Sequence, residues 1–113
     1  MEWNTLNRED QLEDLVKLSE EYRVVIFKHS TSCGISRMIL KQVESIIGSQ
    51  NPEQVQYFFL DLLRYRSVSN AIASKFGVIH QSPQMIILDK GEVVYADSHS
   101  SINIDYLVSK NRA

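Results

Sequence analysis

The feature that most constrains the fold is a buried-strand pattern that leads into one long amphipathic helix. Residues 24–27 form a continuous β-branched and aromatic run, which is typical of a strand covered on both faces. After a short polar segment, apolar residues recur at three- and four-residue steps up to Gly48 and predict a helix. These apolar positions are Ile35, Met38, Ile39, Val43, Ile46 and Ile47. Residues 55–62 are again aromatic and aliphatic, so we expect two parallel strands joined by a right-handed helical crossover.

The rest of the sequence predicts further helices and a hairpin. A first helix is expected from an Asn7 cap to about residue 22, and a third from a Ser67 cap to Gly77. Residues 85–88 and 93–96 have strand composition and flank a turn signal at residues 89–91, which predicts an antiparallel hairpin. A last helix is expected to begin at Ser100 or Ser101.

The order of these elements predicts an α/β fold. A parallel pair followed by an antiparallel hairpin gives one mixed four-stranded sheet with helices on both faces. The length of 113 residues suits one core, so residues 1–113 are expected to form a single domain. This layout resembles the thioredoxin fold.

Composition argues against several classes of function. The formal charge is −2 and no run of Lys and Arg exists, so we expect no nucleic-acid partner. No apolar stretch approaches the roughly 20 residues that span a bilayer, so we expect no membrane partner. One cysteine cannot form an internal disulfide, which favours a reducing, cytoplasmic location. Three scattered histidines match no zinc spacing, and neither a metal nor a bound cofactor is expected.

Cys33 is the candidate nucleophile. It lies between the buried strand and the long helix, where the positive end of the helix dipole favours a thiolate. Lowering its pKa from about 8.5 to about 7 would give roughly fifteenfold more thiolate at pH 7. Ser36 follows three residues later on the same helix face and can donate a hydrogen bond to the sulfur. Because serine cannot attack a mixed disulfide, an outside thiol is expected to complete the reaction.

Two alternatives concern the surroundings of Cys33. A free cysteine is often simply a small buried apolar residue, but the polar residues 29–32 favour a surface loop. His29 could stabilise the thiolate as an imidazolium, although a surface histidine paired with solvent is the simpler interpretation. The same two interpretations apply to His80.

A resemblance to a known family adds to this interpretation. Residues 25–36, which end in Cys-Gly-Ile-Ser, together with Ser82-Pro83-Gln84, resemble the YtxJ-like bacilliredoxins of the bacillithiol system. The resemblance implies that Cys33 removes bacillithiol from S-bacillithiolated client proteins through a mixed disulfide, with bacillithiol as the thiol co-substrate. It also implies a cis Pro83 and a substrate-pairing role for the backbone of Ser82. The candidate substrate-binding residues are Thr31, Ser32, Gly34, Ser82 and Pro83.

The sequence departs from that family at Gly34, where proline is usual, and at Ser32, where threonine is common. Cys-Gly-Ile-Ser is also close to the Cys-Gly-Phe-Ser of monothiol glutaredoxins, which bind glutathione and an iron-sulfur cluster. Against that alternative, Gln81-Ser82-Pro83 replaces their Thr-Val-Pro. A third alternative is a non-catalytic interaction module. The expected partners are a low-molecular-weight thiol and S-thiolated client proteins, and the chain is expected to be a monomer or a weak dimer.

Overall fold

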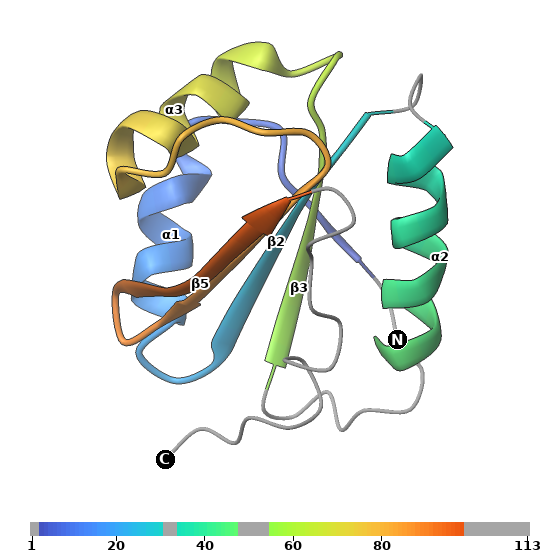
Figure 1. Cartoon of the computed structure of the whole chain (residues 1–113). Coiled ribbons are helices and arrows are strands. Elements are labelled where there is room, and N and C mark those ends of the chain that lie inside the picture. Colours follow the sequence, from blue (N-terminus) through green and yellow to red (C-terminus); the bar gives the residue numbers. More distant parts are fainter. Residues whose placement is uncertain (1–2, 31–33, 48–54, 99–113) are drawn as a thin grey trace.

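The protein contains one mixed sheet of five strands, in the order β1-β3-β2-β4-β5 (Figure 1). We describe residues 3–30, 34–47 and 55–98 of a computed structural model. The strands are β1 Asn4–Thr5, β2 Arg23–His29, β3 Val55–Asp61, β4 Gln84–Asp89 and β5 Glu92–Ser98. The helices in these ranges are α1 Gln11–Leu18, α2 Gly34–Ile47 and α3 Arg66–Phe76. None of them is long and apolar enough to cross a membrane.

β2 is the central strand, as the apolar run predicts. It pairs in parallel with β3 along its whole length, from Arg23 opposite Val55 to His29 opposite Asp61. On its other side it pairs antiparallel with β4, where Lys28 lies opposite Gln84. Every residue of β2 is buried. The prediction of a parallel pair followed by an antiparallel strand is therefore confirmed.

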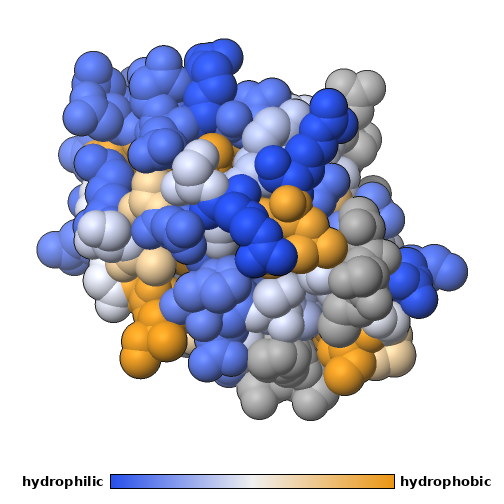
Figure 2. Space-filling view, turned by 90° about the horizontal axis from the view of Figure 1, so that it is seen from above, coloured by the Kyte–Doolittle hydropathy of each residue, from blue (hydrophilic) through white to orange (hydrophobic). Residues whose placement is uncertain are grey.

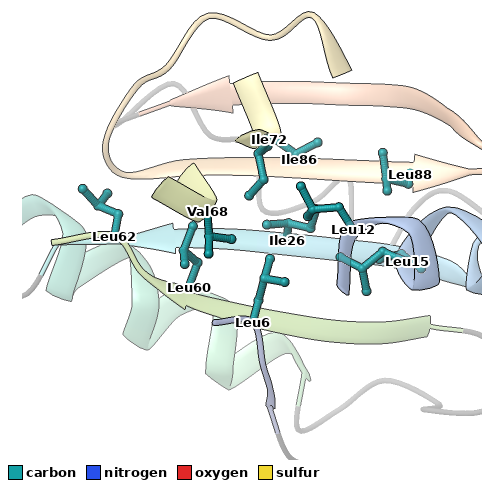
Figure 3. Close-up of a cluster of buried hydrophobic side chains, with 11 residues drawn as sticks. Leu6, Leu12, Leu15, Ile26, Leu60, Leu62, Val68, Ile72, Ile86 and Leu88 are labelled. Carbon is teal, nitrogen blue, oxygen red and sulfur yellow. The ribbon is translucent and has the colours of Figure 1, made fainter. Parts of the chain in front are cut away.

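Helices cover both faces of the sheet, which is also confirmed. In Figure 1, α2 lies on one side of the sheet and α1 with α3 on the other. Successive side chains of β2 alternate between two apolar clusters: Ile26 packs on the α1 and α3 side, whereas Val25 and Phe27 pack on the α2 side. Figure 3 shows the first cluster, in which Val68 and Ile72 of α3 meet leucines from α1 and the sheet.

The strand count differs from the prediction. β1 adds a fifth strand, with Asn4 opposite Phe58 and Thr5 opposite Phe59 in parallel pairing. Its two residues are both exposed, so the strand has no alternation of apolar and polar side chains that would reveal it. The next residue, Leu6, is fully buried in the cluster of Figure 3. The four-stranded prediction thus missed one short edge strand.

Both predicted helix caps are wrong. α1 begins after Asp10, and Asn7 instead gives its backbone N–H to the side chain of Gln11. α3 begins at Arg66, so Ser67 lies within its first turn. Gly77 does end α3, with the positive φ of 65° that favours glycine.

Other predictions are confirmed or untested. The predicted turn between the last two strands is confirmed, since Lys90 and Gly91 both have positive φ. The expected terminal helix from Ser100 or Ser101 lies outside the described residues, as does the expected helix end at Gly48.

Candidate functional site

The candidate site lies at the edge of the sheet where β2 leads toward α2. β2 ends at His29 and α2 begins at Gly34, so the predicted strand-to-helix junction is present. Three predicted site residues, Thr31, Ser32 and Cys33, fall outside the described residues. The other predicted site residues, Gly34, Ser36, Ser82 and Pro83, are described.

Ser36 is the polar centre of this edge. Its side chain is fully buried in the first turn of α2. The backbone N–H of Ser30 donates to Ser36 Oγ at 3.0 Å, and the same oxygen lies 2.7 Å from Nδ1 of His29. These bonds join the end of β2 to the start of α2. Whether Ser36 also donates to Cys33, as the spacing predicts, remains a prediction.

His29 is buried, so its interpretation as a surface histidine is wrong. Only 4% of its surface is exposed, and its ring stacks on Phe27 at 6.2 Å and contacts Phe59 at 5.4 Å between centroids. The strand continues through His29, whose backbone pairs with Asp61 of β3, and these aromatic neighbours cover its ring. Ser30 is buried as well, so residues 29 and 30 do not belong to a surface loop.

The protonation of His29 follows from this burial. Burial lowers the pKa of His29 below its ordinary value of 6.5; Asp61 and Glu44 act against this shift and Arg37 acts with it. A lowered pKa keeps the imidazole neutral at pH 7. A lasting imidazolium charge on His29 is therefore disfavoured.

Ser82 and Pro83 lie beside the end of β2. The peptide bond between them is cis, as the resemblance implied. Because Gln84 is opposite Lys28 in the antiparallel pair, the two preceding residues reach the level of the last residues of β2. Pro83 is buried, and the hydroxyl oxygen of Ser82 is buried without a hydrogen-bond partner within the described residues.

A buried lysine at this edge was not predicted. Lys28 is fully buried on β2, and its Nζ lies 3.3 Å from both the Ser69 carbonyl oxygen and Nδ1 of His80. Burial lowers its pKa from 10.5 to about 8. No salt bridge to Lys28 occurs in the part of the chain that the structure describes. The signal available in the sequence was a lysine directly after a run of buried-strand residues.

His80 is an exposed residue whose ring is tied to this lysine. The Lys28 ammonium group can only donate hydrogen bonds, so Nδ1 of His80 must accept one from it. The ring proton of His80 therefore lies on Nε2. Ser69 Oγ lies 3.1 Å from the same nitrogen. Partial burial of the ring and the positive charges of Lys28 and Arg66 lower the pKa of His80. A thiolate-stabilising imidazolium is disfavoured here too.

Gln84 supports the loop that carries Ser82 and Pro83. It is buried, and its Nε2 donates to the carbonyl oxygen of Ile79 at 3.0 Å. Lys28 contacts the next loop residue, His80. Two buried polar side chains on neighbouring strands therefore hold the loop from inside.

The outer surface of this edge combines apolar and basic side chains. Ile35 and Met38 of α2 are 45% and 51% exposed, although the apolar stripe predicted them on the buried face, where Ile39 and Val43 do lie. Ile79 in the loop before Pro83 is 82% exposed. Three arginines are exposed as well: Arg37 on α2, Arg64 two residues before α3, and Arg66 at its start. Figure 2, seen from this end of the sheet, shows apolar side chains among mostly hydrophilic ones.

Gly34 is not required for the conformation of this edge. It is exposed, its φ is not positive, and an added Cβ would meet only Arg37 Nη2 at 3.7 Å. That distance is an ordinary van der Waals contact. The position therefore has room for a side chain.

Comparison with known proteins gives consistent findings. The family model of monothiol bacilliredoxin BrxC matches residues 4–107. A solved structure provisionally described as an oxidoreductase with a thioredoxin fold is 29% identical to this chain, with a TM-score of 0.80, and the match covers 92% of this chain and 88% of the other.

Solved thioredoxins from two organisms have the same fold. That of Fasciola hepatica is 21% identical with a TM-score of 0.70 and coverages of 93% and 92%. Reduced thioredoxin of Schistosoma mansoni is 19% identical with a TM-score of 0.71 and coverages of 96% and 93%. The predicted thioredoxin fold is confirmed, with five strands in place of four.

Proposed function

Because the chain belongs to the monothiol bacilliredoxin family, we propose that it is a thiol-disulfide oxidoreductase that removes bacillithiol from S-bacillithiolated client proteins through a mixed disulfide on Cys33. The observation that carries the proposal is the family match over residues 4–107 on a chain with one cysteine, placed in sequence directly before α2. The 14-residue helix α2 supports a thiolate at that place through its dipole.

The proposed reaction has two exchange steps. The Cys33 thiolate attacks the bacillithiol sulfur of the client disulfide, whose S–S bond breaks. The client sulfur leaves as a thiolate and takes a proton from solvent, while Cys33 retains the bacillithiol. The thiolate of a second bacillithiol then attacks the bacillithiol sulfur on Cys33. This step releases the Cys33 thiolate and bacillithiol disulfide, and it needs the second thiol molecule because the chain has no other cysteine.

The proposed substrate-binding residues surround Cys33 in sequence or reach the same edge in the fold. Thr31, Ser32 and Gly34 are its neighbours along the chain. Ser82 and the cis Pro83 come to this edge through the pairing of β4 with β2, and the Ser82 backbone is proposed to pair with the bound client segment. The exposed apolar side chains of Ile35, Met38 and Ile79 favour contact with a protein rather than with a small thiol alone.

We further propose that the protein works in the cytoplasm as a monomer or a weak dimer, with bacillithiol as co-substrate and no resident cofactor. A lone cysteine suits a reducing compartment, where bacillithiol stays available as the resolving thiol.

The test is transfer of bacillithiol between two proteins. The reduced protein is mixed with an S-bacillithiolated client, and intact-mass spectrometry follows both chains. We expect the client to lose, and Cys33 to gain, the mass of one bacillithiol, and Cys33→Ser to abolish the exchange. A parallel S-glutathionylated client distinguishes the alternatives, because transfer of glutathione alone would favour a glutaredoxin-type protein. Transfer from neither client would refute the proposal and favour a non-catalytic module.

A further inference from the structure

The loop between α3 and β4, residues 78–83, is held by side chains instead of by backbone pairing. This proline loop carries Ser82 and the cis Pro83 to the start of β4. Within the described residues, no hydrogen bond joins the backbone of residues 79–82 to another backbone group. The position of the proline loop therefore depends on polar side chains that reach it from the sheet and from α3.

Lys28 reaches the proline loop from inside the sheet. Its side chain is fully buried on β2, and its Nζ lies 3.3 Å from Nδ1 of His80 and 3.3 Å from the carbonyl oxygen of Ser69 on α3. The hydroxyl oxygen of Ser69 lies 3.1 Å from the same His80 nitrogen. A hydrogen bond from a charged donor is about twice as strong as one between neutral groups. One ammonium group thus joins β2, α3 and the proline loop.

Gln84 makes a second contact on the same face of the sheet. It lies opposite Lys28 in the antiparallel pair, and its Nε2 donates to the carbonyl oxygen of Ile79 at 3.0 Å. Two consecutive loop residues, Ile79 and His80, are therefore bound from below. Residues 81–83 alone separate them from β4, so fixing His80 also restricts the Ser82 backbone.

Stability does not explain a charge at position 28. Lys28 is buried and has no salt bridge within the described residues, and burying a charge without an opposite one costs free energy. Both of its hydrogen bonds lead to α3 and to the proline loop. Residues that lower stability are commonly retained for function. The contacts of Lys28 indicate that its function concerns the position of this loop.

We infer that Lys28 and His80 are positioning residues that fix the proline loop, and with it the Ser82 backbone that is proposed to pair with a client segment. The part that concerns the client rests on the proposed function. The anchoring of the loop is a property of the fold, and it can be measured without any client.

The anchor requires a neutral His80. Nδ1 accepts from the lysine only while it carries no proton, and a protonated ring would face the ammonium group with a like charge. Partial burial, Lys28 on β2 and Arg66 at the start of α3 all hold the pKa of His80 below its ordinary value. The anchor is therefore kept at pH 7 and released when acid protonates His80.

Two variants of nearly equal shape test the anchor. His80→Asn places a side-chain oxygen where Nδ1 lies, whereas His80→Leu has no acceptor. Backbone 15N NMR order parameters of residues 79–82 should be about 0.85 in wild type and His80→Asn at pH 7, and below about 0.6 in His80→Leu. Acid should lower them in wild type at the His80 titration midpoint but not in His80→Asn. Equal values in wild type and His80→Leu, or no change in wild type across that midpoint, would overturn the anchor.

Lys28→Met separates this role from a contribution to stability. The variant should unfold at higher urea than wild type, because the buried charge is gone, and yet its proline loop should have the low order parameters of His80→Leu. A lysine with a purely structural role would leave the loop unchanged. An ordered loop in Lys28→Met would therefore overturn the role of Lys28.

Exchange with an S-bacillithiolated client tests the consequence for binding. We expect KM for the client to rise about fivefold to tenfold in His80→Leu with kcat unchanged, and to return to the wild-type value in His80→Asn, because a loop that is in place for a fraction of the time weakens apparent affinity by that fraction. A wild type that exchanges no disulfide would refute the proposed function, while the order parameters would still decide the anchor. An active wild type with a loosened loop and an unchanged KM in His80→Leu would refute the positioning role alone.

Discussion

Replacing Lys28 by methionine removes the positive charge that β2 holds in the protein interior. The side chain is fully buried, and its pKa falls from 10.5 to about 8 because burial disfavours the charged form. A lowering of this size corresponds to about 3 kcal/mol of unfolding free energy at pH 7. Loss of the two 3.3 Å contacts of Nζ lowers the free energy of unfolding by about 1 kcal/mol and so offsets part of this gain. We therefore expect Lys28→Met to be about 2 kcal/mol more stable than wild type at pH 7.

The difference in unfolding free energy between Lys28→Met and wild type should depend on pH. Below pH 8 the folded protein holds the charged lysine and the full penalty applies. Between about pH 8 and 10.5 the unfolded chain still binds the proton while the folded protein has released it, so wild-type stability rises with pH relative to the variant. The advantage of Lys28→Met should shrink by about 2 to 3 kcal/mol between pH 7 and pH 10.

Urea unfolding followed by circular dichroism at both pH values measures these differences. Lys17→Met on the exposed surface of α1 is the matched control, and it should stay within about 0.5 kcal/mol of wild type at either pH. A constant difference between Lys28→Met and wild type across this range would refute the reasoning. So would a destabilised variant at pH 7, since it would show that the buried charge is well paired.

Three further substitutions test local features. Gly34→Ala should raise the free energy of unfolding by about 0.5 kcal/mol in urea titrations, because the new Cβ meets only Arg37 at 3.7 Å and alanine favours a helix; a clear loss would show that the site needs glycine. Gly77→Ala should lower that free energy by about 1 kcal/mol, since its φ of 65° strains any other residue, and an unchanged value would contradict the left-handed helix end. Ser19→Ala should cost about 1 to 2 kcal/mol, because Ser19 Oγ accepts the Gly91 N–H at 2.8 Å and anchors the hairpin turn. Thermal unfolding checks this loss, and a melting temperature equal to that of wild type would argue against the anchor.

Regular elements were predictable where the pattern of side chains is local. The run at residues 24–27 identified the central strand, and Val68 and Ile72 identified the buried face of α3. The caps at Asn7 and Ser67 were not, because α1 starts after Asp10 and α3 after Tyr65, and neither of these residues makes a side-chain capping hydrogen bond that sequence rules could identify. β1 was missed for the related reason that two exposed residues form no pattern.

The candidate site was predictable in place but not in its inner contacts. The junction before α2 and the proline before β4 follow from the order of the elements. The burial of His29 does not, because it depends on Phe59, which the parallel pairing of β3 brings beside it from thirty residues away in sequence. The bond from Lys28 to His80 likewise joins positions 52 residues apart.

The sequence alone therefore determined the succession of the longer strands and helices from α1 to β5 and the position of the lone cysteine ahead of α2. Both rest on periodicity and spacing, which act over a few residues. Only the tertiary structure decided which polar side chains are buried and which groups they contact in the interior. His29 and Lys28 owe their lowered pKa values to that burial, and burial is created by elements that are distant in the chain.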